Sequence, residues 1–174
     1  MHTIIVSGGF DPIHKGHIRY LQEARELGDR LFVILNGDSF LMRKKGYYCF
    51  DLDERTEILQ AIKGVDSIYR YESEKDDVCE VIEFINKMKM DDETFTFAKG
   101  GDRRPDGDPI PEVEVCKQLG IDIVYGVGGT DKPNSSSWII DNVVKQLKHK
   151  TTKQITKELH DERLQHKLEL EEEK

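Results

Sequence analysis

The chain has 174 residues, of which 34% are charged, and its formal net charge is −8 at pH 7. This length fits one domain with a real hydrophobic core and argues against a protein of several domains. The acidic balance argues against a general nucleic-acid surface, because affinity for DNA or RNA comes mainly from clustered lysines and arginines. We therefore expect small-molecule partners and no nucleic acid.

The three cysteines, Cys49, Cys79 and Cys116, are odd in number and widely spaced. They form no C-x-x-C pair and no cluster with histidines, so we expect three reduced thiols and no zinc site. The sequence starts on strand-like residues, and no apolar run approaches the roughly 20 residues of a membrane span. These features predict a cytoplasmic protein without membrane contact.

Short β-rich runs alternate with helical patterns along the chain, which is typical of βαβ units and a parallel sheet. The predicted strands are residues 3–7, 30–35, 67–71, 94–98 and 121–125. Most of them are continuous apolar runs, as expected for strands that are buried on both faces. The predicted fold class is α/β, with a Rossmann-like five-stranded parallel sheet and helices on both faces.

Four predicted helices lie between these strands, and the first covers about residues 17–26. Asp51, with Glu54 three residues later, resembles a capping box at the start of the second helix. Apolar residues at positions 78, 81, 82 and 85 form the core-facing stripe of the third. Pro111 suits the first turn of the fourth helix, and Gly120 suits its end.

A fifth helix is predicted from about Ser135, with Ile140, Val144 and Leu147 facing inward and Trp138 in the core. After residue 150 the composition becomes almost entirely charged or polar. The few apolar residues of this segment allow a narrow seam that packs on the domain or on a second subunit, whereas a solvated tail explains the same composition. We predict a domain over residues 1–150 and a charged C-terminal helix or tail over 151–174, with a homodimer left open.

The stretch that points most directly to chemistry reads GGFDPIHKGH over residues 8–17 and follows the first strand. Two histidines three apart occur by chance in many proteins, but the glycine turn and the helix start make this arrangement specific. His14 and His17 fall at the helix N-terminus, where free backbone N–H groups bind phosphate. The segment predicts a polyphosphate site.

Ligands of open α/β sheets bind outside the carboxyl ends of the strands, so the loops after the strands should converge. These loops carry RKKGYY at 43–48, KGGDRR at 99–104 and GGTDK at 128–132, followed by three serines at 135–137. Positive charge that follows the topology of an acidic protein favours a phosphate pocket. A solvated basic loop, a glycine turn and a single-serine helix cap are the structural alternatives.

These residues resemble the signatures of the cytidylyltransferase-like nucleotidyltransferases, a superfamily marked by H-x-G-H, over roughly residues 1–147. GGFDPIHKGH is similar to the first signature, and NSSSWII at 134–140 is similar to the last. The resemblance implies that His14 and His17 hold a triphosphate, which Lys44 or Lys45 neutralises from a mobile second loop. The predicted nucleotide-binding residues are Gly8, Gly9, Phe10, Asp11, Lys99, Gly100, Gly101, Asp102, Ser135, Ser136 and Ser137.

The reaction that the resemblance implies transfers a nucleoside monophosphate from ATP or CTP to a small phosphate monoester, such as a sugar or polyol phosphate, and releases pyrophosphate. Arg55 and Arg103 are the predicted contacts of the acceptor phosphate. Mg²⁺ is the expected cofactor, held mainly by the triphosphate near Asp11, because no dense carboxylate cluster is present.

The motifs point to two branches of this superfamily. KGGD at 99–102 resembles heptose-phosphate adenylyltransferases, whereas Arg55 and the chain length resemble glycerol-phosphate cytidylyltransferases. TDKPN at 130–134 stands where the cytidylyltransferase pattern has Arg-Thr-Glu-Gly, and Lys132 cannot reproduce the planar donor fork of an arginine. The balance favours ATP.

One other function stays open at this point, and another is excluded. A nucleotide-binding regulator would keep the pocket without turnover and act through the C-terminal tail, although the retained histidines and lysines favour an enzyme. A relative of the class I aminoacyl-tRNA synthetases fails on size and charge, because tRNA binding needs a basic surface or an added domain.

Overall fold

The computed structural model describes residues 1–100, 110–129 and 134–149, together with residues 154, 156, 157, 160–163 and 165. The chain divides into two compact units, Met1–Ser136 and Ser137–Lys174. The first unit contains the sheet and the candidate site. The division into residues 1–150 and 151–174 stays a prediction.

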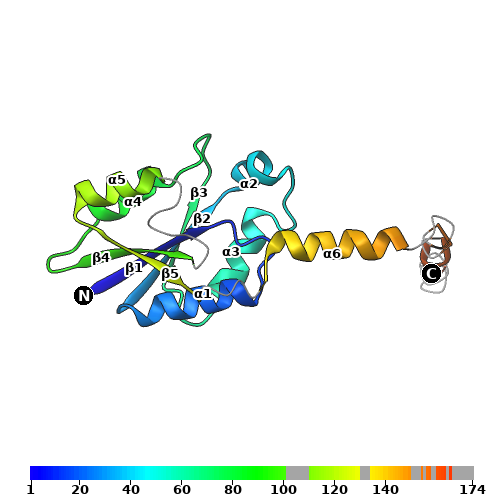
Figure 1. Cartoon of the computed structure of the whole chain (residues 1–174), viewed down its shortest axis with the longest axis horizontal. Coiled ribbons are helices and arrows are strands. Elements are labelled where there is room, and N and C mark those ends of the chain that lie inside the picture. Colours follow the sequence, from blue (N-terminus) through cyan, green and yellow to red (C-terminus); the bar gives the residue numbers. More distant parts are fainter. Residues whose placement is uncertain are drawn as a thin grey trace, which may run out of the picture. The chain divides into compact units, whose positions relative to one another are not determined.

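Five parallel strands form one sheet, as the alternating pattern predicts. They are β1 (His2–Gly8), β2 (Arg30–Asn36), β3 (Ser67–Tyr71), β4 (Thr94–Gly100) and β5 (Asp122–Val127). Their order in the sheet is β3-β2-β1-β4-β5, with β1 in the centre (Figure 1). Ile5 on β1 pairs with Phe32 on one side and with Phe97 on the other, and all three side chains are buried.

Helices connect the strands, and several of their predicted ends are confirmed. The helices are α1 (Lys15–Glu26), α2 (Asp38–Lys45), α3 (Leu52–Gln60), α4 (Cys79–Lys87), α5 (Pro111–Leu119) and α6 (Ser136–His149). The Asp51 side chain caps α3 by accepting a 2.8 Å hydrogen bond from the Glu54 amide. Gly120 ends α5 with a φ of +67° that disfavours other residues.

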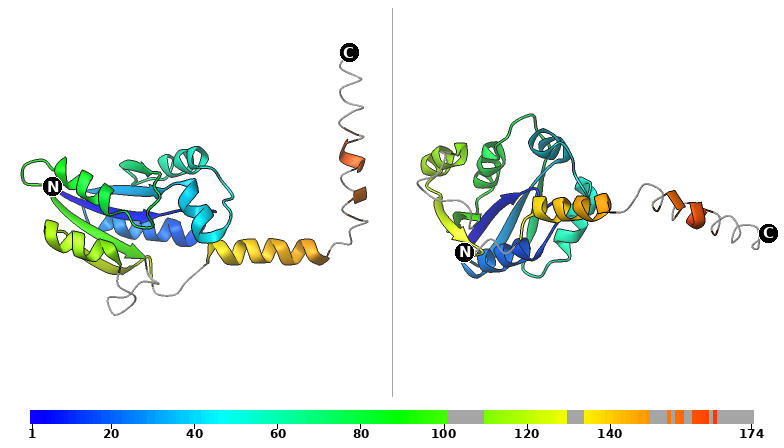
Figure 2. Two further views of the ribbon diagram at one scale, coloured as in Figure 1. Left: turned by 90° about the horizontal axis from the view of Figure 1, so that it is seen from above. Right: turned by 45° about the vertical axis from the view of Figure 1, so that its right-hand side comes forward.

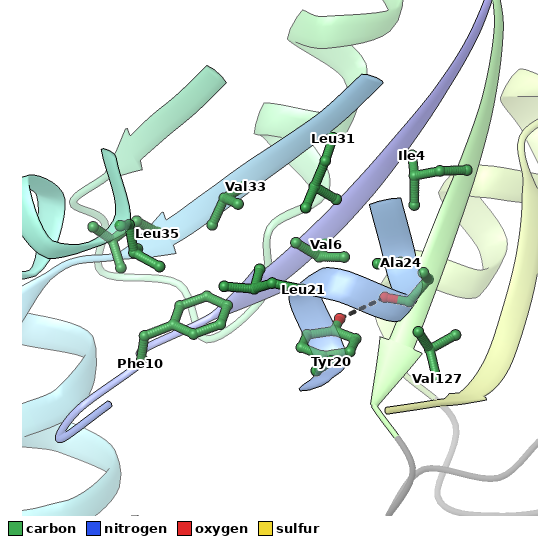
Figure 3. Packing of buried hydrophobic residues seen from close by; sticks show 12 residues of the cluster. Ile4, Val6, Phe10, Tyr20, Leu21, Ala24, Leu31, Val33, Leu35 and Val127 are labelled. Atoms are coloured by element: carbon green, nitrogen blue, oxygen red, sulfur yellow. Dashed lines mark hydrogen bonds between the residues drawn. The ribbon is translucent and has the colours of Figure 1, made fainter. Parts of the chain in front are cut away.

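The sheet has a hydrophobic core on each face. Helices α4 and α5 lie together over one face and α1 lies over the other (Figures 1 and 2). The α1 side includes Ile4, Val6, Leu21, Ala24, Leu31, Val33, Leu59 and Val127, and the α4 side includes Ile34, Val81, Ile82, Ile85, Phe95 and Cys116. The Tyr20 hydroxyl donates to the Ala98 carbonyl at 2.7 Å, which ties α1 to β4 (Figure 3). At Gly128, with φ of +88°, a Cβ would lie 2.9 Å from the Tyr20 Cα, so a larger residue there would push α1 away.

One prediction is wrong. The basic run after β2 is not a loop, because Arg43, Lys44 and Lys45 form the last turn of helix α2. Helix α6 lies in the second unit from Ser137 onward, so the inward packing of Trp138, Ile140, Val144 and Leu147 stays a prediction.

The strand order fixes where a ligand should bind. The chain runs from β1 to β2 and β3 on one side and then crosses to β4 and β5 on the other, so the connections reverse direction between β1 and β4. Crevices at such switch points, outside the carboxyl ends of the strands, are the usual ligand sites of this architecture. In the described part of the chain, no helix combines the length and the apolar character needed to cross a membrane.

Candidate functional site

The two histidines lie at the start of α1, directly beyond the end of β1. His14 is the N-cap residue, and its Nδ1 accepts a 3.0 Å hydrogen bond from the Gly16 amide. Because an acceptor nitrogen carries no proton, the neutral ring of His14 keeps its proton on Nε2. The cap therefore fixes the His14 ring at the positive end of the helix dipole, where an anion is favoured.

His17 packs between two other rings. Its ring centre lies 3.8 Å from that of His14, with 23° between the planes, and 5.1 Å from the ring centre of Phe10. Its Nδ1 is buried and has no hydrogen-bond partner among the described residues. Since buried polar atoms are nearly always paired, this nitrogen is a position where a ligand contact would satisfy the protein.

Burial above all, and then the proximity of His14 and of the Lys45 ammonium, lower the pKa of His17 to about 3. The imidazole is therefore neutral at pH 7. Because an approaching polyphosphate adds negative charge, it would raise this pKa and strengthen a hydrogen bond from the ring.

The depressed pKa of His17 predicts how stability changes with pH. Below pH 6.5, the usual pKa of histidine in an unfolded chain, the unfolded chain binds a proton at His17 that the folded protein does not bind. Protonation therefore stabilises the unfolded state relative to the folded state. We expect the free energy of unfolding to fall with decreasing pH by up to about 1.4 kcal/mol per unit until pH approaches 3. Urea denaturation between pH 7 and pH 5 should show this loss in the wild type and a smaller loss in His17→Gln, with the exposed His160→Gln as control. Equal slopes in the wild type and His17→Gln would contradict the assignment.

Helix α2 brings one of the two predicted lysines to the histidine segment. The Nζ of Lys45 donates to the backbone carbonyl of Asp11 at 2.8 Å. Partial burial, opposed by Asp11 and aided by Lys44, lowers the pKa of Lys45. Lys44 is exposed, with its Nζ 5.2 Å from the centre of the Phe40 ring. Of this pair, Lys45 is thus the one that contacts the GGFDPIHKGH segment.

Asp11 anchors the turn after β1 in the structure. Asp11 is 1% exposed, and its two carboxylate oxygens accept the backbone amides of Cys49 and Phe50 at 2.8 and 2.9 Å. The carboxylate therefore fixes the segment that follows α2 onto the turn after β1. The contact of Asp11 with the nucleotide and its place near Mg²⁺ stay predictions.

Arg55, predicted to bind the acceptor phosphate, is 1% exposed inside the protein. Its Nε donates to the Phe50 carbonyl at 3.0 Å, and its Nη1 donates to the Gly9 carbonyl at 2.8 Å. Further bonds reach the Asn36 carbonyl at 2.7 Å and the Asp38 carboxylate at 2.5 Å. The guanidinium joins the turns after β1 and β2 to the segment before α3, so it positions the site rather than facing an acceptor.

The glycines and the phenylalanine of the first turn have packing reasons for their identity. A Cβ at Gly9 would lie 2.6 Å from a methyl carbon of Leu41, and a Cβ at Gly8 would lie 3.0 Å from the Phe10 ring. Phe10 itself is 3% exposed and supports His17 from the core side, so its side chain is not a surface for the nucleotide. The backbone of Gly8 and Gly9 remains the predicted nucleotide contact.

The serine segment meets the first signature within the first unit. Ser136 is 8% exposed, and its Oγ donates to the carbonyl of Pro12 at 3.0 Å across 124 positions of sequence. The Ser135 amide donates to the Asn134 side chain at 2.9 Å. Ser137 belongs to the second unit, so its role stays a prediction.

The end of β4 contributes Lys99 and Gly100 to the described part of the chain. The Nζ of Lys99 lies 3.7 Å from the Glu112 carboxylate and 4.3 Å from the centre of the Phe97 ring. Lys99 therefore already has a buried partner, which weakens its predicted role as a phosphate ligand. Gly101, Asp102 and Arg103 lie outside the described residues.

Sequence reasoning missed Glu72, which follows β3. Its carboxylate accepts the amides of Asp38 and Ser39 at 3.0 and 2.8 Å and thereby caps α2. An acidic residue after a strand carries no local signal of this contact, because the helix that it caps lies 34 residues earlier in the sequence.

Comparisons with known proteins agree with this geometry. The profile of the cytidylyltransferase-like family matches residues 5–142. The bifunctional protein HldE of Trichlorobacter lovleyi is 33% identical over 129 residues, which are 73% of this chain and 22% of that protein. HldE of Pelobacter propionicus is 32% identical over 147 residues, which are 82% and 27% of the two chains. The FAD synthase of Methanobrevibacter smithii is 36% identical over 89 residues, 49% of this chain and 58% of that protein. The chain thus spans only about a quarter of the length of these HldE proteins.

Solved structures show the same architecture. The lipopolysaccharide core biosynthesis protein of Thermoplasma volcanium is 26% identical with a TM-score of 0.54, and the match covers 72% of this chain and 95% of that one. A structure from Vibrio parahaemolyticus shares the fold with a TM-score of 0.56 at 12% identity, over 83% of this chain and 88% of that one. With the H-x-G-H pair at the helix start and a family profile that covers most of the sequence, this chain belongs to the cytidylyltransferase-like family.

Proposed function

We propose that this protein is a nucleotidyltransferase that moves a nucleoside monophosphate from a nucleoside triphosphate to a small phosphate monoester. The observation that carries the proposal is the stacked pair of His14 and His17 at the N-terminus of α1, with the Lys45 ammonium close by. These groups suit a polyphosphate substrate, because negative charge develops on the pyrophosphate leaving group during the reaction.

The chemistry needs no covalent enzyme intermediate. An oxygen of the acceptor phosphate attacks the α-phosphorus of the triphosphate, and the bond from that phosphorus to the bridging oxygen breaks. The electron pair leaves with pyrophosphate, and a diphosphate-linked product forms. Because the acceptor is already an anion, the protein has to hold two anions in line and stabilise the developing negative charge.

The site residues have separate roles in binding the anions and stabilising the developing charge. His14 presents Nε2–H, while neutral His17 offers a second imidazole in a dry environment, where a hydrogen bond to developing charge is strong. Lys45 supplies a full positive charge. The positive end of the α1 dipole favours an anion at the same place.

Mg²⁺ belongs in this scheme as part of the substrate, bound to the triphosphate. The Asp11 carboxylate is buried and accepts two backbone amides, so we assign it the placement of the turn after β1. The described residues also bring together no group of three or more histidine, cysteine or acidic side chains suited to a metal ion. The protein's own contribution in this proposal comes from its histidines and Lys45.

ATP is the preferred donor in this proposal. The FAD synthase relative makes a product that contains adenine, and KGGD at 99–102 resembles the adenylyltransferase branch. The acceptor class that we favour is a sugar or polyol phosphate, since the Thermoplasma relative is a lipopolysaccharide core biosynthesis protein.

Pyrophosphate release tests the proposal directly. The purified chain with Mg²⁺ and either ATP or CTP should be assayed against glycerol 3-phosphate, heptose and other sugar 1-phosphates, phosphocholine, phosphopantetheine, nicotinamide mononucleotide and flavin mononucleotide. We expect turnover with one donor and one acceptor, with a linked product confirmed by mass spectrometry. Nucleotide binding without pyrophosphate from any pair would instead support the regulator, and the tail would then be the segment to study.

A further inference from the structure

Glu72 acts on helix α2 from outside that helix. Its carboxylate accepts the amides of Asp38 and Ser39 and also the Ser39 hydroxyl. The N-cap residue of α2 is Gly37, which has no side chain with which to cap. Glu72 therefore satisfies the first amides of α2 and places a negative charge at the positive end of the helix dipole.

Gly37 makes room for this cap. A Cβ at position 37 would lie 1.5 Å from a carboxylate oxygen of Glu72, so a side chain there and the cap exclude each other. The Gly37 amide donates to the Tyr71 carbonyl at 2.9 Å, which holds the two backbones together at this point. The glycine and the glutamate thus form one joint between the ends of β2 and β3.

The segment that begins with Glu72 also holds the other end of α2. In the last turn, the Nη2 of Arg43 donates to the carbonyls of Ser73 and Lys75 at 2.8 and 3.0 Å, and its Nε lies 3.1 Å from the Asp76 carboxylate. Residues 72–76, which we name the α2 bracket, therefore contact both the first and the last turn of the helix.

The same helix places Lys45 against the turn that follows β1. Lys45 is its last residue, and its ammonium reaches the Asp11 carbonyl at 2.8 Å. Leu41, one turn earlier and 1% exposed, packs where a Cβ of Gly9 would otherwise lie. A shift of α2 would thus move Lys45 directly, because Lys45 belongs to the last turn of this helix.

We infer that Glu72 is a positioning residue for Lys45, and that the α2 bracket sets the distance between this lysine and the bound triphosphate. The expected effect on turnover rests on the proposed function, whereas the contact between Glu72 and α2 does not depend on it. Burial opposes ionisation of Glu72, yet the hydrogen bonds from Ser39 and the Asp38 amide outweigh it and lower the pKa, so the cap is charged at neutral pH.

A double-mutant cycle tests the link to Lys45. Glu72→Ala should lower kcat for pyrophosphate release by roughly tenfold or more, since small misplacements of a catalytic group are costly. In a Lys45→Met background the same substitution should change kcat by less than about twofold, because the group that it positions is gone. Glu72→Gln keeps an acceptor oxygen and should recover part of the loss, and Glu83→Ala removes an exposed acid on α4 as the matched control.

Hydrogen exchange of the α2 amides gives a readout without turnover. Glu72→Ala should speed the exchange of residues 40–45 and leave α5 unchanged, whereas Glu83→Ala should not change the exchange of either helix. Equal losses of kcat in both lysine backgrounds, or unchanged exchange in α2, would overturn the inference. If the wild type releases no pyrophosphate but α2 exchange rises in Glu72→Ala, the proposed function fails while the bracket remains.

Discussion

We expect His17→Ala to lower kcat for pyrophosphate release by roughly 30- to 1,000-fold, which is about 2 to 4 kcal/mol of transition-state stabilisation and the scale of losing one preorganised donor. His17 is neutral, largely buried and stacked on His14, so its ring is fixed before substrate arrives. A water that enters the vacated space cannot reproduce this orientation. Steady-state kinetics with the active donor and acceptor pair measures the effect.

The controls separate chemistry from folding. His160→Ala removes an exposed histidine of the second unit and should keep kcat within about twofold, as surface substitutions usually have small effects. His17→Asn retains an N–H donor of similar reach and should recover part of the lost rate. Near-normal turnover of a folded His17→Ala would remove His17 from the mechanism.

Arg55→Ala should destabilise the first unit on the order of 3 kcal/mol, since truncating a buried, fully bonded charge leaves its partners unsatisfied. The guanidinium that this substitution removes donates hydrogen bonds to the carbonyls of Gly9, Asn36 and Phe50. It also forms an ion pair with Asp38. The turn after β1, which leads into the histidines, would lose one of its anchors at the same time. Urea denaturation of the wild type and the variant measures the difference in unfolding free energy.

Two further variants show whether geometry or charge matters at this position. Arg55→Lys keeps the positive charge but lacks the planar fork, so it should recover only part of the stability. Arg70→Ala breaks an exposed pair with Asp53, for which we expect a loss under about 1 kcal/mol. If Arg55→Ala is as stable as Arg70→Ala and loses only affinity for the acceptor, the acceptor-binding role first predicted for Arg55 would be restored.

The layout of the fold could be predicted from local patterns. Continuous apolar runs marked the five strands to within two residues at each end, because strands buried on both faces consist mostly of apolar residues. Asp51 and Gly120 marked helix ends through their own side-chain and backbone preferences. The histidine pair was also visible, because its function depends on a helix N-terminus that the neighbouring residues define.

Helix α2 and the role of Arg55 could not be predicted in this way. The helix has eight residues and a glycine N-cap, and its stabilising carboxylate comes from position 72. Nothing in the sequence distinguishes Arg55 from other helix arginines. Its partners include the carbonyl of Gly9, which follows β1, and the carbonyl of Asn36, which ends β2.

The sequence by itself therefore determined the α/β architecture, the family signature and the place of His14 and His17, since each depends on residues close together in the chain. The tertiary structure decided which lysine reaches the histidine segment, and it made Asp11 and Arg55 internal anchors. Those outcomes depend on contacts between turns that follow different strands. Hydrogen-bond partners 34 to 46 residues apart leave no periodic trace in a sequence, and only the folded sheet brings them together.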